Sequence, residues 1–131
     1  MKRIKEKASS ILKDEDNILF AYLYGSTATG KFTEDSDIDI GIYCSDQEHD
    51  NLYPERLSAE LEKEFGREVD VRILNERNLI FLHQVLKNGE LIFSKDERKR
   101  VEFETGVYDR YLDMKYYFDK YNEIRRKRVT S

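Results

Sequence analysis

The sequence has a single cysteine, Cys44, and a single proline, Pro54, in 131 residues. One cysteine cannot form a disulfide within the chain, which fits a reducing compartment. No apolar run is long enough to cross a bilayer, and the charged residues 1–7 lead into no hydrophobic signal segment. We therefore expect a soluble, cytoplasmic protein with no membrane contact.

An excess of basic residues is also missing. Lys and Arg total 23 against 27 Asp and Glu, which gives a formal net charge of −4. A protein that binds the phosphate backbone of nucleic acids is normally basic, so we expect no direct nucleic-acid contact. The chain has no internal repeat, low-complexity stretch or linker, and its length predicts one domain over residues 1–131.

Hydrophobic periodicity predicts alternating helices and strands, an α/β arrangement. Apolar residues three or four apart indicate a helix in the first fifteen residues and three later helices. The predicted strands are short apolar or alternating runs. The strands are expected at 18–24, 38–43, 68–74 and 90–93, and the later helices at 54–66, 75–89 and 94–128.

The ends of two helices carry capping signals. Asn75 is expected to cap one helix, and Ser94 with Glu97 forms a capping-box pattern at the start of the long final helix. That final helix has an apolar stripe, which predicts packing against the domain or, alternatively, a partner surface. The stripe comprises Tyr108, Tyr111, Met114, Phe118, Tyr121 and Ile124.

Two side chains with reactive groups are interpreted as structural. Cys44 lies at the end of a strand and His49 in the polar loop after it, which favours a strand-end thiol over Cys/His catalysis. His83 lies within an apolar set and is interpreted as a satisfied, partly buried histidine rather than a ligand or base.

The central motif links a turn to a pair of acids. Gly25 and Ser26 follow the apolar strand, and a turn there exposes backbone N–H groups that suit an anion. Asp37 and Asp39 begin the next strand, and residues two apart in a strand face the same way. The motif predicts a phosphate site beside a divalent metal, as for a nucleoside triphosphate.

Two other metal or phosphate motifs are incomplete. Residues 25–32 nearly match the loop G-x-x-x-x-G-K-[S/T], but Phe32 stands where a hydroxyl must ligate magnesium. Acids at 35, 37 and 39 imitate a calcium loop, but Ile40 stands where its glycine is needed. Further along, Asp70 faces away from the core in the alternating strand 68–74. It belongs either to a solvated face, paired with Arg72, or to a site.

A Gly-Ser turn, an Asp-x-Asp pair and a later strand carboxylate together resemble the polymerase-β nucleotidyltransferase superfamily. The small size, residues 36–40 (Ser-Asp-Ile-Asp-Ile) and the single long final helix are similar to the minimal nucleotidyltransferase (MNT) antitoxins, partners of HEPN-domain ribonuclease toxins. The resemblance implies a small mixed sheet flanked by helices, with the long helix 94–128 as part of the domain.

The resemblance also implies roles for the acids. Asp37 and Asp39 would hold the metals that bridge the phosphates of ATP, and Asp70 would ligate the catalytic metal and help to deprotonate the attacking hydroxyl. Oxygen ligands favour Mg²⁺ or Mn²⁺. Gly25 and Ser26 would contact the phosphates.

One departure from the family concerns the phosphate site. Many members carry arginine where this chain has Thr27 and Thr29. Either Lys31, which follows Gly30 in the same segment, or an arginine from elsewhere would then take over, and Gly30 and Lys31 are included in the predicted nucleotide site.

The expected reaction is transfer of AMP from ATP to a tyrosine hydroxyl of a HEPN toxin, which neutralises the toxin. The sequence is compatible with a homodimer or with a hetero-oligomer containing the toxin. Two alternatives stay open: an antitoxin that acts by binding alone, and a nucleotidyltransferase for a small-molecule hydroxyl.

Overall fold

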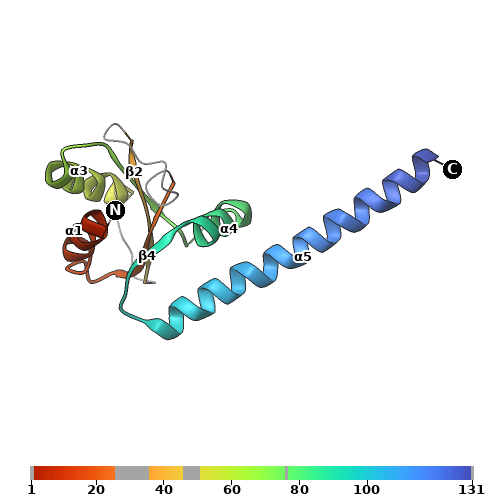
Figure 1. Cartoon of the computed structure of the whole chain (residues 1–131). Helices are drawn as coiled ribbons and strands as arrows, with labels where there is room; N and C mark the ends of the chain where they lie inside the picture. Colours follow the sequence, from red (N-terminus) through yellow and green to blue (C-terminus); the bar gives the residue numbers. More distant parts are fainter. Residues whose placement is uncertain (1, 26–35, 46–50, 76, 131) are drawn as a thin grey trace.

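The structure is a computed structural model that describes residues 2–25, 36–45, 51–75 and 77–130. Four helices and four strands lie in these ranges (Figure 1). They are α1 (Lys2–Leu12), β1 (Ile18–Tyr24), β2 (Ile38–Cys44), α3 (Tyr53–Phe65), β3 (Val69–Ile73), α4 (Leu79–Asn88), β4 (Glu90–Ser94) and α5 (Glu97–Thr130).

The strands form one mixed sheet in the order β3-β2-β1-β4. β1 pairs antiparallel with both β2 and β4, whereas β2 and β3 run parallel. A parallel pair needs a crossover between its strands, and α3 provides it. The predicted α/β fold, with a small mixed sheet and a long final helix, is confirmed.

The two faces of the sheet carry separate apolar clusters. On one face Ile38, Ile40 and Ile42 of β2 pack with side chains of α1 and α3. On the other face Phe20 and Tyr22 of β1 pack with α4 and the first part of α5. Alternate residues of a strand point to opposite faces, so Asp39, between two core isoleucines, must point toward the α4 face.

The start and end of α3 agree with the sequence signals. Pro54 lies in the first turn, where a missing N–H breaks no helical hydrogen bond. Gly66 ends the helix in the left-handed conformation (φ 66°), and its N–H donates to the Glu62 carbonyl over 2.8 Å.

The sequence predicted the wrong asparagine as the cap of α4. Asn78, not Asn75, caps the helix, and its side chain accepts a hydrogen bond from the Phe81 N–H over 2.8 Å. Asn75 instead bonds both backbone groups of Cys44, at 2.9 and 2.8 Å. It therefore fixes the end of β2 against the segment after β3.

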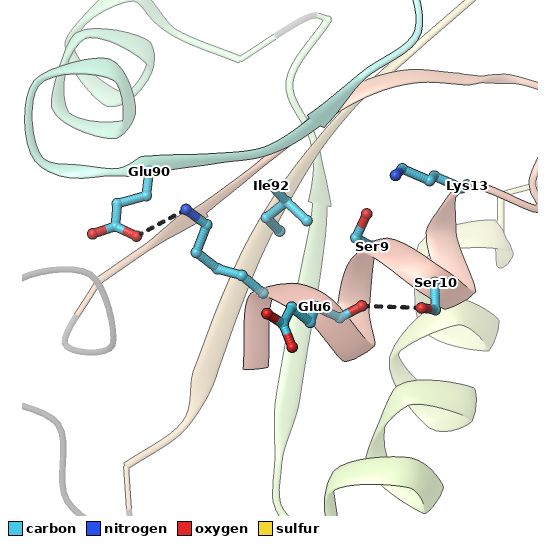
Figure 2. A pocket seen from close by; sticks show the side chains of 7 residues that line it. Glu6, Ser9, Ser10, Lys13, Glu90 and Ile92 are labelled. Atoms are coloured by element: carbon cyan, nitrogen blue, oxygen red, sulfur yellow. Dashed lines mark hydrogen bonds and ion pairs between the residues drawn. The ribbon is translucent and has the colours of Figure 1, made fainter. Parts of the chain in front are cut away.

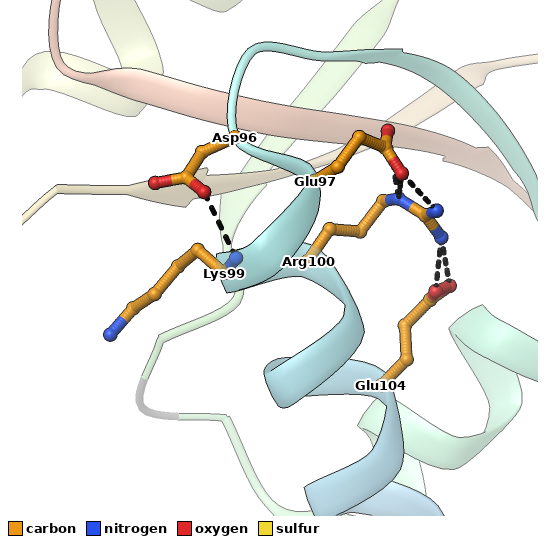
Figure 3. A network of polar contacts seen from close by, with 5 residues as sticks. All are labelled: Asp96, Glu97, Lys99, Arg100 and Glu104. Carbon is orange, nitrogen blue, oxygen red and sulfur yellow. Dashed lines mark hydrogen bonds and ion pairs between the residues drawn. The ribbon is translucent and has the colours of Figure 1, made fainter.

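The start of α5 also differs from the prediction. Ser94 is the last residue of β4, and the cap is Asp96, whose carboxylate accepts the Lys99 N–H over 3.0 Å. Figure 3 shows Arg100 of the first turn between two carboxylates, those of Glu97 and Glu104. The helix is where the sequence indicated, but a different residue begins it.

Only the first part of α5 packs on the body of the protein. Val107 is fully buried, and the Tyr111 ring stacks on the His83 ring of α4 with centroids 3.5 Å apart. Beyond this contact the helix projects away from the sheet (Figure 1). No helix in the described ranges is both long enough and apolar enough to span a membrane.

His83 is partly buried, as predicted, but its environment is not fully satisfied. Besides the stack on Tyr111, its ring meets Tyr108 edge-on at 5.8 Å. Its Nδ1 atom is buried and has no hydrogen-bond partner among the described residues. Aromatic contact, rather than hydrogen bonding through Nδ1, holds this side chain between α4 and α5.

Candidate active site

Two of the three predicted acids meet across neighbouring strands. Asp39 of β2 and Asp70 of β3 are register partners in the parallel pair, and Tyr24 of β1 is the antiparallel partner of Asp39. Register partners share a face, so these three side chains line the α4 side of the sheet. Asp37 lies two residues before Asp39 and is exposed.

Like charges surround the Asp39 carboxyl group. Burial raises its pKa most, and the neighbouring Asp70 and Asp37 raise it further, whereas Arg72 lowers it. Burial and nearby negative charge both disfavour the ionised carboxylate. A bound cation would remove this penalty, so the site is electrostatically suited to a positive ligand.

Arg72 is the cation that the strand itself supplies. Its Nε atom lies 2.9 Å from Oδ2 of Asp70, two residues earlier on the same face of β3. Both side chains are close to half exposed, so this pair contributes little to stability by itself. The sequence leaves open whether Asp70 belongs to a solvated pair with Arg72 or to a site. The pair is present, and it lies beside Asp39.

Gly25 brings the turn after β1 directly against Asp39. Its φ of 74° lies in the left-handed region, and a Cβ atom there would collide with Oδ2 of Asp39. Only glycine meets both conditions without strain. The other predicted phosphate-contacting residues, Ser26, Gly30 and Lys31, lie outside the described residues.

Tyr24 is a site neighbour that the sequence did not indicate as functional. Its ring meets Phe81 of α4 edge-on at 5.6 Å. Burial raises the pKa of its hydroxyl to about 12; Asp39 also raises this pKa, while Arg72 and Arg77 lower it. Its only sequence signal is its place just before Gly25, at the end of an apolar strand.

The residues present fit a divalent cation by their chemistry. Asp37, Asp39 and Asp70 offer hard oxygen donors, and the crowding that raises the pKa of Asp39 is what a cation relieves. Within the described ranges no three Asp, Glu, His or Cys side chains are arranged as a ready metal site. Asp70 is turned toward Arg72 instead.

A pocket of about 650 Å³ elsewhere on the molecule does not include these acids. It lies between α1 and β4, where Lys5 and Glu90 form an ion pair of 3.4 Å (Figure 2). Its lining mixes both charges with Ser9 and Ser10. A second pocket, of about 270 Å³, lies where β2 ends and includes Arg77 and Arg110. The site near Asp39 is thus defined by its acids rather than by either cavity.

Known structures share this fold. A chain of a toxin–antitoxin crystal structure with AMP-PNP matches with a TM-score of 0.75 at 23% identity, over 86% of this chain and 90% of that one. A chain from tri-AMPylated Shewanella oneidensis HEPN toxin in complex with MNT antitoxin matches with a TM-score of 0.70 at 21% identity, over 88% and 89%. At these identities the likeness establishes the fold alone.

Sequence relatives support the same grouping. Over 74 residues the chain is 34% identical to a Methanocaldococcus jannaschii protein provisionally named a protein adenylyltransferase. That alignment covers 56% of this chain and 54% of the relative, so the chain spans about half of the relative's length. Residues 6–98, well over half of the chain, match the family described as Polymerase beta, Nucleotidyltransferase. The chain therefore belongs to the polymerase beta nucleotidyltransferase family.

Proposed function

We propose that this protein transfers AMP from ATP to a tyrosine hydroxyl of a HEPN-domain toxin and so acts as its antitoxin. The observation that carries the proposal is the pairing of Asp39 with Asp70 on adjacent strands, beside Gly25 and two residues after Asp37. The name of the M. jannaschii relative and the toxin–antitoxin structures with the same fold support the choice of reaction and partner.

In this proposal the residues divide the work by position. Asp37 and Asp39 would hold divalent ions, which neutralise the triphosphate when bound. Gly25 allows the backbone to approach the phosphates because no side chain intervenes. Asp70 orients the acceptor hydroxyl and takes its proton.

The transfer itself exchanges a phosphoanhydride bond of ATP for a phosphoester bond to the acceptor. The acceptor oxygen forms a bond to the α-phosphorus of ATP, and the bond from that phosphorus to the bridging oxygen breaks. Pyrophosphate leaves with that oxygen, and the hydroxyl proton passes through Asp70 to solvent. No oxidant or reductant is involved.

The proposal also needs positive charge for the phosphates. Arg72 and Arg77 both lower the pKa of Tyr24, so both are close enough to act electrostatically on a side chain that neighbours Asp39. They are the arginines from elsewhere in the chain that could offset Thr27 and Thr29. We assign Arg77 this role: Arg72 is already paired with the Asp70 carboxylate, whereas the Arg77 Nε donates only to a neutral acceptor, the Ile73 carbonyl, over 3.2 Å.

The test combines the purified protein with a HEPN-domain toxin, α-labelled ATP and Mg²⁺. We expect label to appear on a toxin tyrosine, and EDTA, Asp37→Asn or Asp39→Asn to abolish it. Toxin ribonuclease activity should be silenced only where label transfer occurs. If no label transfers while the Asn variants still neutralise the toxin, the catalytic proposal fails and inhibition by binding alone replaces it.

A further inference from the structure

The projecting half of α5 exposes large apolar side chains. Tyr117, Phe118, Tyr121 and Ile124 are 53–70% exposed, and nothing in the described part of the chain covers them. Figure 1 shows this half of the helix standing clear of the body. Contiguous apolar surface of this kind marks an interaction site more often than a free surface.

These side chains share one side of the helix. At about 100° per residue, they and Met114 fall within a sector of about 120°. Nearer the sheet, the same side of α5 carries Phe103 and Val107, which pack in the cluster under α4. We call Met114, Tyr117, Phe118, Tyr121 and Ile124 the distal stripe; it continues the body-facing side of α5 beyond the body.

The charges within the sector of the distal stripe have one sign. Arg110, Arg125 and Arg128 fall on the same side of the helix as the stripe, by the same helical spacing. No acidic residue of the helix falls there. Three acids of this part of α5, Asp109, Asp119 and Glu123, fall on the other side of the helix, and Asp113 borders the stripe, about 20° beyond Ile124.

A second copy of the chain is a poor occupant of this surface. If two stripes packed parallel, each arginine would face its own counterpart, and like charges brought together oppose association. If they packed antiparallel with full overlap, Arg110 of one copy would lie opposite Arg128 of the other, and only the bordering Asp113 would meet an arginine, Arg125.

We propose that the distal stripe docks an apolar face of a different protein, one rimmed by acidic side chains, and that this protein is the acceptor of the adenylyl group. The inference rests on the proposed function for the identity of the partner. Aromatic anchors with an arginine rim match an apolar face with an acidic rim in both shape and charge.

The location of the stripe fits a substrate-docking role. It continues the side of α5 that packs under α4, and Asp39 and Asp70 lie on that same α4 side of the sheet. A protein seated on the stripe therefore lies on the side of the molecule that carries the candidate active site. Docking there would bring an acceptor hydroxyl toward Asp70 rather than toward α1 and α3.

The chain provides a matched control for the binding test. Phe118 and Tyr121 are 59% and 62% exposed on the stripe, while Leu112 and Tyr116 are 61% and 58% exposed on the other side of α5. We compare the double variants Phe118→Glu/Tyr121→Glu and Leu112→Glu/Tyr116→Glu. Binding to the same purified HEPN-domain toxin is measured by titration calorimetry without ATP.

We expect the stripe variant to weaken binding by about 100-fold, as loss of two central anchors does, and the control to change it by less than about threefold. Arg125→Glu/Arg128→Glu should also weaken binding and flatten its dependence on salt. Equal effects of the two apolar variants would overturn the proposal. So would a dimer of this chain, seen by sedimentation, that the stripe variant dissociates.

The same measurements separate this inference from the proposed reaction. Asp39→Asn should bind the partner as tightly as the unchanged protein, because Asp39 lies on the sheet and not on α5. Binding that depends on the stripe without any AMP transfer supports docking and refutes the reaction. AMP transfer with an unchanged KM for the partner in the stripe variant supports the reaction and refutes docking.

Discussion

At the scale of single residues, Gly25 is the position where a small substitution should affect the candidate active site most directly. Gly25→Ala is expected to lower the free energy of unfolding by about 1 kcal/mol, because alanine is strained at φ 74°. It should also abolish AMP transfer, because the new methyl group collides with Oδ2 of Asp39. Urea unfolding and the labelled-ATP assay measure the two effects.

Gly66 separates backbone strain from the collision. It has nearly the same φ, 66°, but a Cβ atom there would meet nothing within 4 Å. Gly66→Ala should therefore show a similar loss of stability and keep the transfer activity. Loss of activity in both variants would mean that Gly25 acts through general stability alone.

Asp39 should make stability depend on pH in a defined direction. Because folding raises its pKa, the folded state holds the Asp39 proton more tightly than the unfolded chain does. This contribution is full below the unfolded pKa of about 4 and is lost as pH rises through the raised value. Asp39→Asn should therefore be more stable than the unchanged protein at pH 7.

The difference should shrink as pH falls and Asp39 of the unchanged protein takes up its proton. Urea unfolding between pH 4 and 8 measures it, and Asp113→Asn, on the exposed part of α5, serves as the control. A stability difference that stays constant across this pH range would contradict the inference that the charge of Asp39 destabilises the folded state.

Sequence reasoning identified the acids better than their surroundings. Asp37 and Asp39 could be placed on one face because strand periodicity is local. The pairing of Asp39 with Asp70 came only from the family resemblance, and Tyr24 was missed. These contacts depend on which strands pair and in which register, and no local pattern in this chain encodes that choice.

At the scale of elements, both capping predictions chose the wrong residue before the right helix. A capping side chain is recognised within a few residues, and in each case a polar residue two or three positions later was equally suitable. Asn75 was already held by Cys44, and Ser94 still belonged to β4. The strand β1 was predicted to the residue because its apolar run is sharply bounded.

The cap of α5 gives a direct test. Asp96→Ala should lower the free energy of unfolding by about 1 kcal/mol, because the Lys99 N–H loses its acceptor. Ser94→Ala should have a smaller effect, since its side chain caps no helix N–H. Thermal and urea unfolding measure the stability lost by each variant. A larger loss for Ser94→Ala than for Asp96→Ala would support a capping box at Ser94.

At the scale of the whole molecule, the stability of the body should not depend on the projecting half of α5. A chain ending at Lys115 retains Val107 and the Tyr111–His83 stack, and residues 116–129, which it loses, are all exposed. Its melting temperature should stay within about 4 °C of the full chain, less than a loss of 1 kcal/mol would cause. Circular dichroism measures this, and a drop beyond about 10 °C would show that the distal half supports the body.

The continuity of α5 from sheet to stripe fixes both a distance and a phase. Seven residues inserted between Lys115 and Tyr116 would move the outer part of the stripe about 10 Å further out and leave it facing almost the same way. Two inserted residues would move it only about 3 Å but turn it by about 200°. The number of residues between the sheet and the stripe thus sets how far a docked protein lies from Asp39. The position of that number within the helical repeat sets which way the docked protein faces.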